Sequence, residues 1–149
     1  MRSYLKRSPL VCLFIGLTII ASCAPQPSYA ETSVGVHIGS VHDKQGFNNI
    51  NPGVYVNHNG WTAGTYYNSE RKQSYYAGYT AQGELVHNLS WGLTVGAITG
   101  YSAGKVIPLV VPSVAYNNDL LGGRTRLSLA VATNKNGANA LHLSHEWGF

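Results

Sequence analysis

Residues 141–149 have the sequence Leu141-His142-Leu143-Ser144-His145-Glu146-Trp147-Gly148-Phe149. One set of alternating positions carries Leu141, Leu143, Trp147 and Phe149, and the opposing set carries His142, Ser144, Glu146 and Gly148. Because successive side chains of a strand point to opposite faces, this period of two predicts a β-strand with one apolar face and one polar face. The same alternation recurs over residues 91–97 and 126–131, which predicts two-faced strands there as well.

Turn-forming residues separate these alternating segments. Polar segments, most of them containing Gly, Asn or Ser, predict seven turns, at 46–49, 57–60, 70–72, 82–83, 102–105, 117–123 and 134–137. The strands expected between them are 33–42, 52–58, 60–68, 73–81, 85–100, 106–116, 124–133 and 139–149. Beyond Glu31 the sequence has no long apolar run and no helical period. An even number of antiparallel strands predicts an all-β, eight-stranded up-and-down barrel.

The charge of the chain is concentrated at its beginning. The formal net charge is +4, but Arg2, Lys6 and Arg7 lie in the first seven residues. From Glu31 onward the chain has seven basic and six acidic residues, which gives a net charge of +1. No basic stripe that could bind nucleic acid remains. No metal-binding motif, phosphate loop or dinucleotide fingerprint is present either, so we expect no metal and no cofactor.

Residues 1–30 are typical of a secretory signal peptide. A basic start is followed by an apolar run over 10–20 and by the small-x-small end Ser28-Tyr29-Ala30, which predicts cleavage before Glu31. Residues 31–149 then form a single domain. An alternative is the lipobox-like Ile20-Ala21-Ser22-Cys23, which would make Cys23 the acylated first residue of a lipoprotein. The other cysteine, Cys12, also lies in this leader, so no disulfide is expected in the domain.

The face opposite the aliphatic residues favours a membrane barrel. It carries glycine, serine, histidine and the charged pair Arg126 and Glu146, whereas aromatic residues gather near strand ends. A transmembrane barrel has apolar residues outside, small and polar ones inside, and aromatic girdles at the interfaces. Phe149, with Trp147 on the same face, resembles the C-terminal signal of outer-membrane barrels. We therefore expect a transmembrane β-barrel in the bacterial outer membrane, with a periplasmic lipoprotein β-sandwich as the alternative.

Several short motifs follow one another in an order that resembles a known family. They are His37, the segment from Asn48 to Gly53, Gly60-Trp61-Thr62-Ala63-Gly64, Tyr67-Asn68-Ser69, Tyr76-Ala77-Gly78-Tyr79, Leu93-Thr94-Val95-Gly96-Ala97, Ile107-Pro108-Leu109-Val110-Val111-Pro112, and an Asn-Gly-rich hairpin before the last strand. Over most of residues 33–149 this order resembles the outer-membrane lipid A palmitoyltransferase (PagP-like) family.

The resemblance implies an activity and a catalytic site. That family moves a palmitoyl chain from a phospholipid to lipid A, using a His, an Asp and a Ser near the extracellular rim. By position His37 and Ser69 match the His and the Ser, but Asn68 stands where the family has Asp. An amide can orient an imidazole but cannot stabilise its cation. His42 is a rival for the role of the His.

The partners implied by the resemblance are phospholipid and lipopolysaccharide in the outer membrane, and we expect a monomer. The alternative function is a non-enzymatic small barrel of structural, adhesive or surface-masking type.

Three prolines and two basic residues are candidates for substrate contact. Proline cannot donate to a strand ladder, so Pro52, Pro108 and Pro112 would interrupt pairing and open lateral gaps for substrate access, as the resembling family is understood to do. They could equally mark strand ends or bulges. Arg71 and Lys72 lie in a turn near the expected rim and could bind the phosphates of lipopolysaccharide, or remain solvated.

A second set of polar residues lies on the last strand. His142, Ser144 and Glu146 are similar to the His-x-Ser and Glu set of the outer-membrane lipid A deacylase. Residues two apart on a strand are about 7 Å apart, which does not ensure a His–Ser hydrogen bond. We therefore interpret them as polar residues of the lumen.

Overall fold

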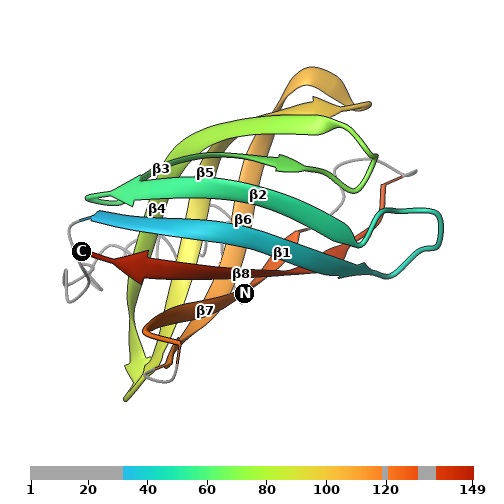
Figure 1. The fold of residues 1–149 in the computed structure, drawn as a ribbon. Helices are drawn as coiled ribbons and strands as arrows, with labels where there is room; N and C mark the ends of the chain where they lie inside the picture. The colour runs from blue at the N-terminus through green and yellow to red at the C-terminus, as the bar shows by residue number, and fades with distance from the viewer. Residues whose placement is uncertain (1–31, 119–120, 131–136) are drawn as a thin grey trace, which may run out of the picture.

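Eight antiparallel strands close into a barrel in the computed structural model, which describes residues 32–118, 121–130 and 137–149 (Figure 1). The strands are β1 (Thr32–His42), β2 (Ile50–His58), β3 (Trp61–Tyr67), β4 (Gln73–Val86), β5 (Leu89–Tyr101), β6 (Gly104–Asn118), β7 (Gly123–Ala130) and β8 (Ala140–Gly148). Each strand pairs with its neighbours in sequence, and β1 pairs with β8 to close the ring. The predicted all-β, up-and-down barrel is confirmed.

Some sequence predictions fall outside this description. The signal peptide at 1–30, the lipobox and both cysteines precede the described residues, and the end of the seventh predicted strand lies in 131–136. Among the described residues no helix is long and apolar enough to cross a membrane.

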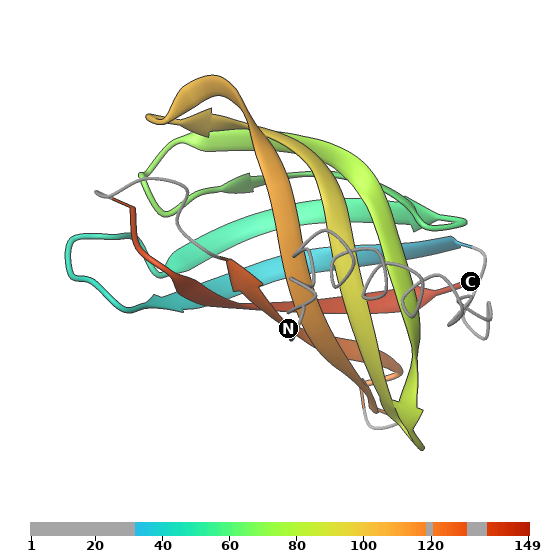
Figure 2. The ribbon, with the colours of Figure 1, turned by 180° about the vertical axis from the view of Figure 1, so that it is seen from behind.

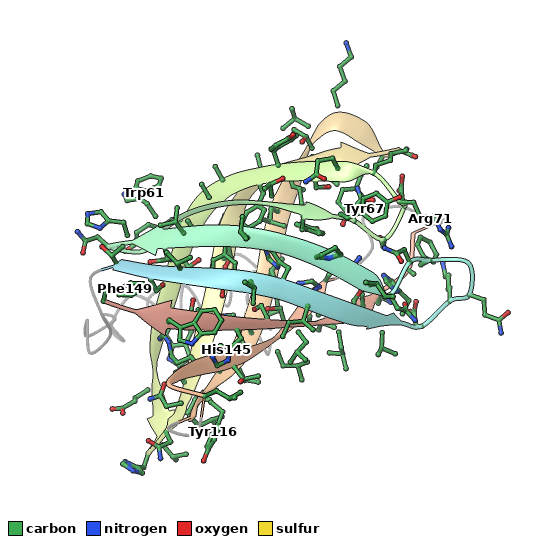
Figure 3. All side chains as sticks on the ribbon, viewed as in Figure 1. Trp61, Tyr67, Arg71, Tyr116, His145 and Phe149 are labelled. Carbon is green, nitrogen blue, oxygen red and sulfur yellow. The ribbon has the colours of Figure 1, made fainter. Side chains whose placement is uncertain are left out.

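The connections divide the barrel into two ends. Those between β1 and β2, β3 and β4, and β5 and β6 share one end, here called the rim, whereas Phe149 and the Asn59-Gly60 turn lie at the other, the base. Figure 3 shows Trp61 and Phe149 at the base and Tyr67 and Arg71 at the rim. Asn59 and Gly60 have φ angles of 51° and 85°, as a tight two-residue hairpin turn requires.

The predicted turn at residues 82–83 is wrong. β4 continues to Val86, and the chain reverses at residues 87–88, where Asn88 has a φ of 64°. Gly83 is paired with Trp91, and a Cβ on Gly83 would lie 2.7 Å from the indole nitrogen. This glycine therefore makes room for a cross-strand aromatic ring. The resulting long strands β4, β5 and β6 form one side of the barrel (Figure 2).

The apolar side chains point outward and the polar ones inward, as the alternation predicted. Aliphatic residues of many strands are exposed on the outer wall, for example Val41, Val95 and Val110 at 70%, 51% and 57%. Buried positions are mainly polar, and those lining the lumen include Ser128, Ser144 and Glu146. This distribution is opposite to that of a water-soluble protein and is typical of a barrel surrounded by lipid.

A β-bulge at Ile38 changes the alternation within β1. His37 pairs with Ser144 of β8 and Gly39 with Leu143, so two steps along β1 oppose one step along β8. The register with β2 shifts at the same place. A bulge can redirect the side chains beyond it. As a result His37 and His42, which are five residues apart and would face opposite ways in a regular strand, both line the lumen.

Candidate functional site

The lumen contains a cavity of about 520 Å³ that reaches from the rim to Arg126. Its volume is within the range of about 300–1,000 Å³ of sites that hold small ligands. One side of the cavity is apolar and is formed by residues of β5 and β6: Ile98, Ile107, Leu109 and Val111. The other side is polar and is formed by residues of β1 and β8: His37, His142, Ser144 and Glu146. The cavity is therefore suited to an elongated, largely apolar molecule with a polar group.

The base side of the cavity is closed by an ion-pair network. One oxygen of Glu146 accepts from Arg124 at 2.7 Å and from Arg126 at 2.9 Å, and the other accepts from the Tyr55 hydroxyl at 3.1 Å. Arg126 also donates to Gln82 and Ser113. The predicted interpretation of Glu146 as a structural lumen residue agrees with these contacts.

Gly92 provides the space for Arg126. A Cβ at Gly92 would lie 2.6 Å from the Arg126 guanidinium and 2.6 Å from the Ser113 hydroxyl. A larger residue at this position would therefore displace the arginine from its partners.

His37 lies in the middle of the lumen, inside an aromatic cluster. Its Nδ1 is 2.8 Å from Nε2 of His142, and its Nε2 is 3.0 Å from the hydroxyl of Tyr76. The rings of Tyr55 and Tyr66 lie 5.0 and 4.9 Å from it. Both ring nitrogens of His37 thus have partners, and neither partner is Ser69 or Asn68.

Asn68 is fully buried and holds the β3–β4 connection together. Its amide nitrogen donates to the Ser74 hydroxyl and to the Gly100 carbonyl, at 2.9 and 2.8 Å. Its side-chain oxygen accepts from the backbone N–H groups of Glu70 and Lys72. These four bonds use both donors and both lone pairs of the amide, and none of them involves His37.

Ser69 follows Asn68 and lines the cavity at the rim. Tyr101 lines the same cavity, and its hydroxyl is 2.8 Å from that of Tyr66. The Ser69 carbonyl accepts from the N–H of Asn48, which joins the β3–β4 connection to the β1–β2 connection. Ser69 is therefore held where the loops meet the lumen.

His42 occupies the same end of the cavity. It is the last residue of β1, its Nδ1 is 2.7 Å from the side-chain oxygen of Asn49, and its ring stacks on Phe47 with centroids 5.3 Å apart. Among the described residues Nε2 of His42 has no hydrogen-bond partner. Sequence reasoning considered His42 but missed Asn49, whose place in an Asn-rich segment gave no sign of this contact.

The prolines coincide with irregular pairing. The ladder between β6 and β7 runs from Ser113 to Asn118, so residues 104–112 of β6, including Pro108 and Pro112, have no β7 partner among the described residues. Pro52 of β2 lies opposite the bulge of β1, where the register shifts between His37 and Gly39. These positions agree with both the lateral-gap and the bulge interpretations.

The basic rim residues make contacts within the protein. Arg71 donates to the carbonyl of Gly46 at 3.1 Å, and Lys72 donates to the Ser102 hydroxyl at 2.7 Å and forms an ion pair with Glu70 at 3.2 Å. Partial burial of Glu70 raises the pKa of its carboxyl, but hydrogen bonds from Ser102 and the charge of Lys72 outweigh this effect, so the pKa is lowered. Whether Arg71 and Lys72 also bind phosphate stays a prediction.

Comparison of the chain with protein-family models gives no match, and comparison with curated proteins gives none either. Within residues 32–118, 121–130 and 137–149, no three His, Cys, Asp or Glu side chains are placed to hold a metal ion.

Proposed function

We propose that the chain is an outer-membrane enzyme that transfers a palmitoyl-type acyl chain from a phospholipid to lipid A. The reaction would take place at the rim of the lumen, with Ser69 and one of the two lumen histidines at the reacting ester. Signal-peptide export and a position in the outer membrane belong to this proposal. The apolar outer wall and the closed barrel support it.

The observation that carries the proposal is the cavity. It joins an apolar side, suited to an acyl chain, to a rim that bears a hydroxyl and an imidazole. Next to the apolar side, the rim half of β6 has no β7 partner among the described residues, and it contains two prolines without an N–H. A chain lying in the outer leaflet could enter there without crossing water, which would otherwise oppose transfer of apolar surface.

The proposal is tested by mass spectrometry of lipid A from a Gram-negative host that lacks such an enzyme. Expression of the full chain should produce a lipid A species heavier by one acyl chain, and Ser69→Ala should reduce it strongly. Ser102→Ala is a matched control, because Ser102 is a rim serine whose contacts are with Glu70 and Lys72. An unchanged lipid A spectrum with correctly folded protein would exclude the proposed activity.

A non-enzymatic barrel is the second candidate, and one observation favours it. The polar groups of the central lumen are paired with one another, as in the His37–His142 and Glu146–Arg126 contacts. Such pairing is sufficient to explain buried polar residues as structural. For this candidate, Ser69→Ala would be silent and changes in the rim connections would alter surface binding.

A further inference from the structure

We infer that His42, held by Asn49, is the general base of the site, and that His37 is a structural residue of the lumen. This inference rests on the proposed function, whose resemblance-based site centres on His37. It differs in its choice of histidine and adds a positioning residue that no sequence motif indicates.

The contact with Asn49 determines the protonation pattern of the His42 ring. A side-chain amide oxygen can only accept, so the nitrogen 2.7 Å from Asn49 Oδ1, which is Nδ1, must carry the proton. In the neutral ring Nε2 then has a free lone pair, as a general base requires. Asn49 therefore supplies the orienting half of a Ser–His–Asn arrangement, the role that Asn68 was expected to fill.

Two other features fix the position of the ring. Phe47 stacks against it at an interplanar angle of 20°, which restricts its rotation. The bulge at Ile38 turns His42 into the lumen, where the ring lines the same cavity as Ser69 and Tyr101. A base restrained from several sides loses little freedom when the substrate binds.

The loops bring His42 and Ser69 to the same level of the barrel. The N–H of Asn48 donates to the carbonyl of Ser69 at 2.8 Å, and the next residue, Asn49, holds His42. His37 lies deeper, and its two nitrogens are occupied by His142 and Tyr76. His42 lies at the rim, and its Nε2 has no hydrogen-bond partner among the described residues.

The proposed step balances without another reactant. Nε2 of His42 takes the proton from a hydroxyl of lipid A as that hydroxyl oxygen bonds to the ester carbonyl carbon of the phospholipid, and the Ser69 hydroxyl donates to the carbonyl oxygen, where negative charge develops. The bond between that carbon and the glycerol oxygen then breaks, and the imidazolium returns the proton to the leaving oxygen. The products are acylated lipid A and a lysophospholipid.

The first test is spectroscopic and does not depend on activity. The full chain, labelled with ¹⁵N-histidine and folded in detergent micelles, should show His42 protonated at Nδ1, the signal being assigned by its loss in His42→Gln. Asn49→Ala should shift this ring toward the Nε2-protonated form, while Asn48→Ala, which removes a neighbouring amide that does not touch His42, should not. An unchanged His42 signal in Asn49→Ala would overturn the inference.

The second test measures acyl transfer. Asn49→Ala should lower kcat about 100-fold with little change in KM, because orientation of the base is lost but substrate binding is not. Asn49→Asp should restore most of kcat, since a carboxylate also accepts from Nδ1–H. His42→Gln should lower kcat at least 100-fold, a larger loss than His37→Gln causes in protein that folds. A larger loss of kcat in His37→Gln than in His42→Gln would overturn the inference.

The two tests separate this inference from the proposed function. One possible outcome is that His42 is protonated at Nδ1 in wild type and loses this pattern in Asn49→Ala, but no acyl transfer occurs. In that case the proposed function fails, and the role of His42 as a base fails with it. The positioning of His42 by Asn49 is then still supported. If transfer occurs and Asn49→Ala is silent in both tests, only the further inference fails.

Discussion

Glu146 carries a negative charge into the lumen and is only 3% exposed. It is paired with Arg124 and Arg126, whose side chains are also largely buried. Glu146→Gln would leave two cations near a neutral group, and breaking a buried ion pair costs about 3–5 kcal/mol. We expect a loss of that size in the free energy of unfolding, measured by urea titration in micelles. The exposed Glu84→Gln should change it by less than about 0.5 kcal/mol. Equal effects of the two variants would argue against a supporting role for the network.

Glu70 links two rim connections, because its carboxylate accepts from the backbone N–H of Ser102 and from Lys72. Its pKa is lowered in the folded barrel, since these contacts outweigh its partial burial. The stabilisation is therefore complete above the ordinary pKa of a glutamate and is lost as pH falls through the lower, folded value. Wild type should lose more stability on acidification through this range than Glu70→Gln, by less than about 1 kcal/mol because the pair is partly exposed. Thermal unfolding of both proteins between pH 3 and pH 7 measures the difference; parallel curves would contradict it.

The first strand is the element whose geometry departs most from its sequence pattern. Unbroken alternation from His37 would place residues 39 and 41 inside, whereas the bulge at Ile38 places Ser40 and His42 inside and Val41 outside. Single cysteines in β1, introduced after Cys12 and Cys23 are replaced by serine, distinguish the two patterns. Ser40→Cys should react with a water-soluble maleimide through the lumen, and Val41→Cys should be protected in a lipid bilayer. The opposite result would show a regular strand without the bulge.

At the element level, the predictions were accurate where a local signal exists. Alternation gave the inner and outer faces of the strands, and Asn59-Gly60 marked its hairpin turn because it can adopt positive φ angles. The turn at 82–83 was misplaced because the same residue type, Gly83, serves instead to accommodate Trp91 from the next strand. A glycine that makes a turn and a glycine that makes room cannot be distinguished without the partner strand.

At the scale of the whole molecule, the candidate site depends on contacts that no local pattern encodes. His37 and His142 are 105 residues apart in sequence and meet only because β1 and β8 close the ring. The bulge that brings His42 into the lumen has no sequence signature either, since Ile38 is an ordinary strand residue. The sequence thus predicted which residues line the lumen more accurately than which of them contact one another.

Closure of the barrel between its first and last strands can be tested directly. Val41 and Leu141 are paired across β1 and β8 on the outer wall, and paired residues of antiparallel strands lie about 4.5–5.5 Å apart between Cα atoms, within disulfide range. With Cys12 and Cys23 replaced, Val41→Cys/Leu141→Cys should oxidise to an intramolecular disulfide, detected by thiol counting and peptide mass spectrometry.

Val41→Cys/Leu129→Cys is the matched control, because Leu129 pairs with Leu141 from the far side of β8 and is about 10 Å from β1. Folded barrel should also migrate faster on a gel than heated protein, with the unheated disulfide variant matching wild type. Oxidation of the control pair, or of neither pair, would contradict a closed barrel and favour an open sheet or a sandwich.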